Sequence, residues 1–285
     1  MNTLEFTLVI ALGAAAAGFL GSLTGLGGGV VIVPLLVWLK VDMHYAIGAA
    51  LVSVIATSSG AAAAYVKEGY SNIRVGMFLE LATTLGAVSG AFLATDGIKH
   101  ITGIKPTSLL SVLFGVVLLF SAYLSLRPPR DDPETGRPDP LASRLRLDST
   151  YPTPRGPQGY HVHGVPLGFV LMYVAGILSG LLGIGSGALK VLAMDRVMRI
   201  PFKVSTTTSN FMIGVTAAAS AGMYLYRGYI DPALAMPVVL GVLLGATLGT
   251  HVLARARVRV LRWVFSAVIV ALAVQMIYDG LTGGR

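Results

Sequence analysis

The chain has 285 residues, of which 54% are apolar and only 12% are charged, and it contains no cysteine. A soluble globular domain carries about 25% Asp, Glu, Lys and Arg. The composition therefore excludes an ordinary water-facing surface and indicates a polytopic membrane protein. Disulfide scaffolds and thiolate metal sites are excluded by the lack of cysteine. The net charge of +8 falls in short loops and not in one patch, which argues against a nucleic-acid partner.

Charges and segment lengths divide the chain into ten apolar segments, since about 20 helical residues cross the hydrocarbon core of a bilayer. In chain order we expect helices over 6–25, 29–40, 45–66, 75–95, 107–126, 166–185, 187–199, 204–226, 233–254 and 260–281. The segments 29–40 and 187–199 are too short to cross, and each follows a glycine-rich break. This pattern predicts a broken or hairpin helix, which membranes tolerate where protein or a water-filled cavity surrounds it.

Lysine and arginine divide unequally between the two ends of these segments, with sixteen on one side and five on the other. The positive-inside rule then places both termini outside the cytoplasm and the loop 127–164 inside. This loop holds eight prolines and eleven charged residues. We expect a flexible cytoplasmic linker, either a spacer or a partner-binding segment, between the units 1–126 and 165–285.

The two halves are similar in sequence. An offset of 158 residues aligns Gly18, Gly25, Gly27 and Gly29 with Gly176, Gly183, Gly185 and Gly187, and an offset of 159 aligns Thr57, Tyr65, Gly69 and Gly86 with Thr216, Tyr224, Gly228 and Gly245. Five segments is an odd number, so the second half enters the membrane in the opposite sense. The sequence thus predicts an all-α membrane fold of two inverted-topology repeats, each opening with a broken helix. Secondary transporters share this architecture, and their binding site lies near the midplane where the broken helices meet.

Two stretches of the second half also resemble a known family. The glycine breaks, the stretch ALKVLAMD at 188–195 and the run PFKVSTTTSNFMIGVT at 201–216 are similar to the sulfite exporter TauE/SafE family. The resemblance implies a bacterial or archaeal inner-membrane permease that exports sulfite, organosulfonates or related small anions. The chain departs from the family at Ser186, where glycine is usual, and at Leu192, where a proline like Pro34 is expected.

Other functions are weighed against export. An anion channel, or a carrier for another small oxyanion or a carboxylate, has the same composition and stays an alternative. An intramembrane enzyme is disfavoured, because Ile184 stands where a G-x-S-G serine protease needs glycine. We predict no cofactor and no metal. The partners we expect are a small anion, protons and the lipid bilayer, and the sequence leaves a homo-oligomer open.

The glycine breaks and the polar runs of the third segments form the predicted anion site. Helix-end N–H groups bind anions, and glycine lets the backbone approach a ligand, although the same glycines also allow tight helix packing. Hydroxyl groups either line the pocket or bond to their own helix. The predicted substrate-binding residues are Gly27, Gly28, Gly29, Thr57, Ser58, Gly185, Ser186, Gly187, Lys190, Ser209 and Asn210.

Two charged residues lie inside apolar segments, where ionisable groups are functional candidates. Lys190 is predicted to bind the anion, with a position at the cytoplasmic interface or a pair with Asp195 as the structural alternatives. Glu80 lies six residues after Arg74, about 9 Å into the membrane. Apolar surroundings favour a protonated carboxyl group, so Glu80 is the proton-coupling candidate, and a structural role, hydrogen-bonded or paired with Arg74, is the alternative.

Overall fold

The computed structural model describes residues 3–24, 28–67, 69–97, 106–126, 139–153, 156–253 and 258–282. The first half contains α1 (Thr3–Thr24), α2 (Gly29–Trp38), α3 (Met43–Lys67), α4 (Ile73–Phe92) with a π turn η1 (Leu93–Gly97), and α6 (Pro106–Leu126). The second half contains α8 (Val165–Leu182), α9 (Gly187–Leu192) with a π turn η2 (Ala193–Val197), α10 (Phe202–Tyr226), α11 (Pro232–Leu253) and α12 (Val258–Leu281). Every one of the ten expected segments is therefore helical, and most ends fall within a few residues of the prediction.

Short polar side chains mark where several helices begin. The Asn72 side chain accepts a hydrogen bond from the Val75 amide at 3.1 Å, and Asp231 accepts one from the Ala233 amide at 2.9 Å. These bonds satisfy N–H groups that have no partner inside the helix. The α4 and α11 helices therefore start at equivalent points of the two halves, since Asn72 and Asp231 are 159 residues apart.

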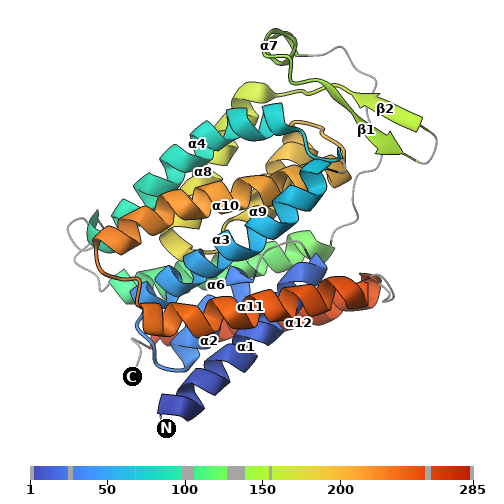
Figure 1. Cartoon of the computed structure of the whole chain (residues 1–285). Coiled ribbons are helices and arrows are strands. Elements are labelled where there is room, and N and C mark those ends of the chain that lie inside the picture. The colour runs from blue at the N-terminus through green and yellow to red at the C-terminus, as the bar shows by residue number, and fades with distance from the viewer. Residues whose placement is uncertain are drawn as a thin grey trace.

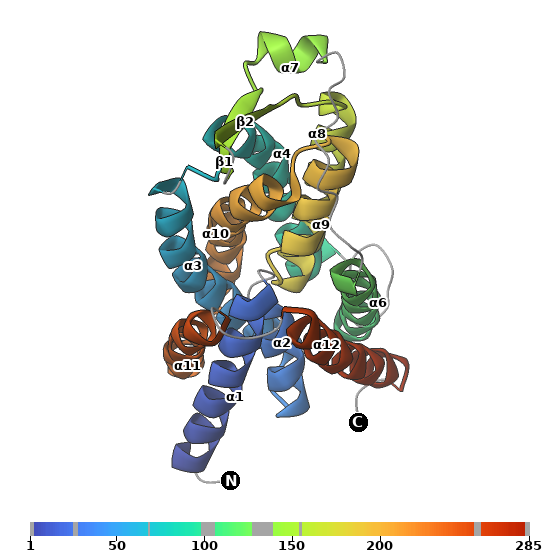
Figure 2. The same ribbon diagram turned by 90° about the vertical axis from the view of Figure 1, so that its right-hand side faces the viewer.

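The helices pack mainly against helices of the other half (Figures 1 and 2). The α1 helix packs on α11, α8 on α4, α3 on α10 and α6 on α12. Glycines make the closest of these crossings possible. A Cβ atom on Gly18 would collide with the Val242 carbonyl of α11, and one on Gly176 would collide with the Thr83 carbonyl of α4. Small residues of this kind let helix backbones approach in membrane proteins.

Large apolar side chains cover the outer surfaces of α4 and α11. Met77, Leu81 and Leu85 are each more than 60% exposed, and Leu244 and Leu248 are exposed to the same extent. Contiguous apolar surface of this size marks contact with another apolar phase. By length and composition, two described helical stretches, 73–95 and 165–182, suffice to cross a membrane, and six further apolar stretches of 10–17 residues are shorter.

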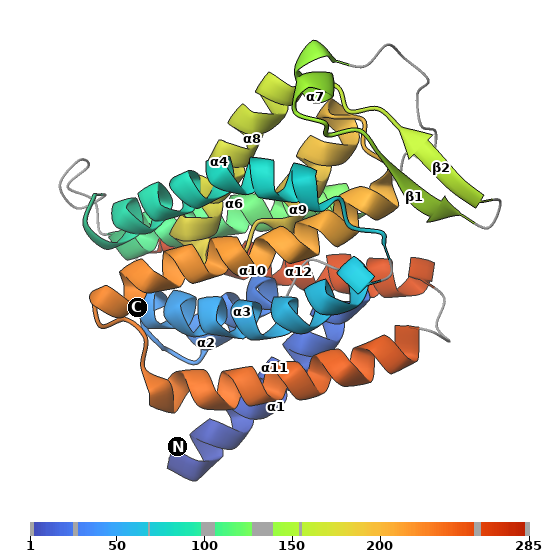
Figure 3. The same ribbon diagram turned by 45° about the horizontal axis from the view of Figure 1, so that its top comes forward.

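The segment before α8 is folded where the structure describes it. It forms a short helix α7 (Pro140–Arg144) and an antiparallel hairpin of β1 (Ser149–Thr153) and β2 (Gly156–Tyr160), which lies against the ends of α4 and α10 (Figure 3). The side-chain amide group of Asn72 donates to the Leu147 carbonyl at 2.9 Å and to the Tyr160 hydroxyl at 2.7 Å. Burial raises the pKa of Tyr160 to about 12, so its phenol stays neutral at physiological pH.

The prediction of a flexible linker is therefore wrong for residues 139–153 and 156–164, whereas 127–138 lie outside the described residues. A few apolar side chains explain the difference, because Ala142, Leu147, Tyr160 and Val162 are buried in one core with residues of α4 and α8. Proline content and charge describe the average of the segment and do not register these few contacts.

Candidate functional site

The break between α8 and α9 uses left-handed backbone at three positions. Gly183 and Gly185 both have φ of +68°, and Ser186 has φ of +47°. Glycine adopts this region freely, whereas a residue with a side chain is strained there by about 1 kcal/mol or more. A serine therefore occupies position 186 at a conformational cost, which makes its hydroxyl group a candidate functional group.

The two breaks touch each other in the interior. A Cβ atom on Gly29, the first residue of α2, would lie 3.0 Å from the Gly183 carbonyl and 2.8 Å from the Val54 side chain. Only glycine allows this approach of the first residue of α2 to the second break. The structure therefore brings Gly29 against Gly183 and Ile184 of the second break, whereas Gly28 faces Val242 of α11 and Gly27 lies outside the described residues.

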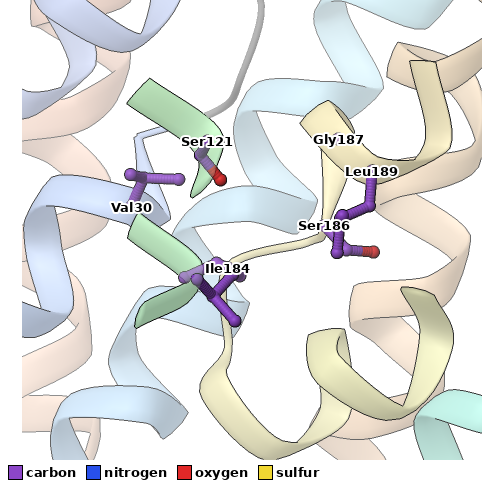
Figure 4. A pocket seen from close by; sticks show the side chains of 7 residues that line it. Val30, Ser121, Ile184, Ser186, Gly187 and Leu189 are labelled. Atoms are coloured by element: carbon purple, nitrogen blue, oxygen red, sulfur yellow. The ribbon is translucent and has the colours of Figure 1, made fainter. Parts of the chain in front are cut away.

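A small cavity lies beside the second break (Figure 4). Its walls come from α2, from α6 and from the break before α9, and its lining residues are Val30, Val117, Ser121, Ile184, Ser186, Gly187 and Leu189. Counted as space for the centre of a water molecule, its volume is about 10 Å³, which is room for about one water. The Ser186 hydroxyl is buried and has no hydrogen-bond partner in the structure, so it is available to a polar ligand.

Lys190 follows Ser186 by one helical turn, on the same face of α9. Its side chain is fully buried, and its ammonium group donates a short hydrogen bond to the Thr216 hydroxyl of α10. The Thr216 hydroxyl lies 2.6 Å from Glu80 Oε1, and Lys190 Nζ lies 4.0 Å from Glu80 Oε2. Three helices thus place one buried cation, one hydroxyl and one buried carboxylate in a single cluster.

The contacts of Lys190 and Glu80 differ from the ion pairs with Asp195 and Arg74 that the sequence offered as structural alternatives, and the hydrogen bonds of Glu80 to Thr216 and Thr84 agree with a structural role as well as a functional one. Lys190 neither reaches an interface nor bonds to Asp195 in the contacts found, and the Asp195 carboxylate lies 3.2 Å from Arg196 instead. Arg74 likewise donates to the Arg146 carbonyl. Lys190, Thr216 and Glu80 lie on three different helices, α9, α10 and α4. Their contacts therefore arise from helix packing and not from the local sequence.

The predicted polar site residues of α3, Thr57 and Ser58, make different contacts from those of α10, Ser209 and Asn210. Thr57 donates to the Ser53 and Val54 carbonyls, and Ser58 donates to the Ile55 carbonyl, all within α3. These own-helix bonds are the ones that the packing alternative expects.

The α10 run reaches the break instead. Ser209 donates to the Gly187 carbonyl at 3.3 Å, while Asn210, next to it, is half-buried. The α10 side of the predicted site therefore touches the break directly.

Thr216 is the cluster residue that the sequence did not single out. It was visible as the repeat partner of Thr57 and as the last residue of the run at 201–216, but nothing in the sequence distinguishes it from a threonine bonded to its own helix. In the structure its hydroxyl also lies 2.9 Å from the Met212 carbonyl of α10. The link to Lys190 and Glu80 becomes apparent only from the crossing of α4, α9 and α10.

A known sequence family matches nearly the whole chain. The description "Sulfite exporter TauE/SafE" applies to the family that matches residues 10–276. The chain belongs to the sulfite exporter TauE/SafE family. The TauE/SafE family is one of membrane transporters, so the chain is a multi-pass membrane protein of that class.

Several relatives are similar over their full length. The probable membrane transporter protein YunE of Bacillus subtilis (strain 168) is 28% identical, over 98% of this chain and 99% of its own. The probable membrane transporter protein ORF9 of Sinorhizobium sp is 24% identical, over 98% and 96%, and a probable membrane transporter protein of Xylella fastidiosa (strain 9a5c) is 25% identical, over 95% of both chains. No solved structure matches the chain significantly.

Proposed function

We propose that this TauE/SafE protein is a secondary transporter that exports small sulfur-containing anions, such as sulfite or organosulfonates, across the inner membrane. The observation that carries the proposal is the fully buried ammonium group of Lys190, one turn from the partnerless Ser186 hydroxyl. The Ser186 hydroxyl lines the cavity and the buried Lys190 side chain follows four residues later, so a hydrogen-bond donor and a positive charge of the kind that suits a compact oxyanion lie in the same region of the chain.

An inverted duplication is part of the proposal, and the glycine crossings support it. Gly18 meets the Val242 carbonyl while Gly176, its repeat partner, meets the Thr83 carbonyl, and Val242 and Thr83 are themselves 159 residues apart. In the same way Gly245 meets the Ala15 carbonyl and Gly86 meets the Tyr173 carbonyl. The α1–α11 and α8–α4 crossings are therefore made by the same positions of the two copies.

The outward-facing side chains support the same register. Met77, Leu81 and Leu85 of α4 are exposed, and the residues 159 positions later on α11 are Met236, Leu240 and Leu244, also exposed. Equivalent lipid-facing positions in both copies agree with two repeats embedded in one bilayer. The proposed orientation has both termini outside the cytoplasm and the segment 127–164 inside, as the distribution of lysine and arginine indicates.

The substrate is proposed to lie between the two breaks, near the midplane. Gly28, Gly29, Gly185 and Gly187 bring the backbone close to it, and Ser186 and Lys190 supply a donor and a positive charge. Gly27, Thr57, Ser58, Ser209 and Asn210 complete the proposed lining. Glu80 is the proposed proton carrier, because it is the carboxyl group nearest to Lys190 among the described contacts.

Thermal unfolding of the purified protein in a panel of anions tests this function. A ligand at 100 times its Kd stabilises the native state by about 2.7 kcal/mol. We expect sulfite and methanesulfonate to raise Tm in the wild type and in the control variant Lys203→Met, whose lysine is exposed. The variant Lys190→Met is expected to lose the response. If no sulfur oxyanion raises Tm of the wild type, the proposed substrate class is wrong.

A further inference from the structure

The cluster joins the two halves, because Glu80 comes from α4 of the first half and Lys190 and Thr216 come from α9 and α10 of the second. The repeat partners of its two charged residues are Ile32, 158 positions before Lys190, and Val239, 159 positions after Glu80. Thr216 alone is preserved, as Thr57, whose hydroxyl donates to carbonyls of its own helix. The place related to the cluster by the repeat therefore lacks both charges, so the ion pair is present at one of two equivalent positions.

The ion pair in the cluster is loosely made. Its closest charged atoms are 4.0 Å apart, and Glu80 Oε2 has no hydrogen-bond partner. Glu80 Oε1 is held by the hydroxyl groups of Thr216 and Thr84, at 2.6 Å and 3.2 Å. A lone charge is expensive in a membrane protein interior, so each member of the pair must keep an opposite charge or become neutral.

The Thr216 hydroxyl suits both charge states of Glu80. It has one hydrogen and two acceptor positions, and besides accepting from Lys190 it lies within bonding distance of Glu80 and of the Met212 carbonyl. When Glu80 is ionised, Thr216 donates to the carboxylate. When Glu80 is protonated, the carboxyl group donates to Thr216, whose hydrogen turns to Met212. No heavy atom has to move between the two states.

We propose that the site carries one univalent anion together with one proton. The anion replaces Glu80 as the partner of Lys190, and Glu80 becomes neutral by taking a proton from water on the side to which the cavity is open. On the other side the anion and the proton leave, and the Lys190–Glu80 pair forms again. The site is electrically neutral both when it is loaded and when it is empty. Reorientation of the carrier in either state therefore places no unpaired charge in the membrane. The inference rests on the proposed function and specifies the charge of its substrate.

Other titratable groups on the surrounding helices have contacts elsewhere. Among the described residues these are Tyr173 of α8 beside Ser89, Lys203 of α10 over the Tyr70 ring, Tyr224 of α10 on the Gly180 carbonyl, and Asp195 of η2 beside Arg196, with Tyr123 of α6 and Tyr226 of α10 exposed. Lys190 is therefore the cation that the anion meets, and one positive charge neutralises one negative charge. A divalent anion would leave a buried net charge, so sulfate is a poor substrate.

Proteoliposomes containing the full chain test the stoichiometry. They are loaded with methanesulfonate, which is univalent near neutral pH, and the voltage is set with potassium and valinomycin. We expect efflux that follows a pH gradient, does not change with voltage, and moves one proton per anion as measured with an internal pH dye. Sulfate efflux is expected to be at least tenfold slower. Voltage-driven efflux without proton movement overturns the coupling while leaving the transporter assignment intact. If neither sulfite, methanesulfonate nor sulfate moves, the proposed function itself fails.

Glu80→Gln separates a proton carrier from a structural residue. This variant keeps an acceptor for Thr216 but is permanently neutral, so the empty site would contain an unpaired Lys190 charge. The carrier therefore reorients only when an anion is bound. We expect exchange of internal for external anion to persist within about threefold of the wild type, while net proton-coupled efflux falls at least tenfold. Equal loss of exchange and net efflux contradicts the proton-carrier role.

Thr216→Val tests the hydroxyl, and a buried threonine of α4, Thr83, supplies the control. Valine has nearly the shape of threonine, so the change removes the bridge and leaves the packing. We expect at least tenfold slower net efflux that no longer follows the pH gradient, restored by Thr216→Ser. The matched variant Thr83→Val removes a buried hydroxyl that donates only to carbonyls of its own helix in the contacts found and is expected to stay within twofold of the wild type. Equal behaviour of the two valine variants overturns the role of Thr216.

Discussion

Removal of the Lys190 charge alone should destabilise the protein more than removal of both charges of the cluster. Lys190 is fully buried and Glu80 is 7% exposed, so the carboxylate left behind in Lys190→Met has little water to replace its partner. Two unit charges 4.0 Å apart attract by about 4 kcal/mol at an effective dielectric constant of 20. Breaking a buried pair from one side costs about 3–5 kcal/mol. We therefore expect Lys190→Met to lose about 4 kcal/mol of stability.

The double variant Lys190→Met with Glu80→Gln should recover most of this loss. It contains no buried charge, and glutamine still accepts hydrogen bonds from Thr216 and Thr84 at Oε1. Replacing a whole buried pair by neutral groups is often close to neutral in free energy. A double-mutant cycle therefore gives a large coupling between the two sites.

Thermal unfolding in detergent measures the cycle. A loss of about 4 kcal/mol corresponds to a fall in Tm of roughly 10 °C for a chain of this size. Additive effects of the two substitutions, with a coupling under about 1 kcal/mol, would show that the pair is not energetically linked and refute this reasoning.

Four further substitutions follow from the local surroundings of single residues. Gly86→Ala forces a Cβ atom onto a backbone carbonyl of α8 and should cost about 1–3 kcal/mol. Gly222→Ala, with nothing within 4 Å of its new atom, should be neutral or stabilising in the same unfolding assay. Asn72→Ala removes a helix cap and two bonds to the segment before α8, so tryptic cleavage at Arg144 should become at least roughly tenfold faster. Ser186→Gly relieves left-handed strain and should raise stability by about 1 kcal/mol while weakening sulfite binding; an unchanged sulfite affinity would remove the Ser186 hydroxyl from the site.

The helices were predictable because apolar length and glycine breaks are local properties. The expected segment 29–40 is a helix over Gly29–Trp38, and the expected break at 183–187 is formed by left-handed residues at Gly183, Gly185 and Ser186. Glycine needs no partner elsewhere in the chain to mark such a place. Charge and length therefore predicted where the chain is helical and where its helices are interrupted.

Contacts between helices were not predictable in the same way. The ion-pair partners that the sequence suggested for Lys190 and Glu80 were Asp195 and Arg74, whereas the structure places the two residues in contact with each other and with Thr216. Local spacing says which residues share a helix face, but the partner across a helix crossing depends on the packing of α4, α9 and α10. The same applies to the segment before α8, where a few buried side chains outweigh a composition typical of a linker.

Counterflow of sulfite in proteoliposomes tests the central claim most directly. Vesicles containing the wild-type protein are loaded with unlabelled sulfite, and radiolabelled sulfite is added outside. A secondary transporter predicts transient accumulation of label that saturates with external sulfite and is absent in Lys190→Met but present in Lys203→Met. Label that only equilibrates, without accumulation or saturation, or single-channel currents carried by the anion, would contradict the account.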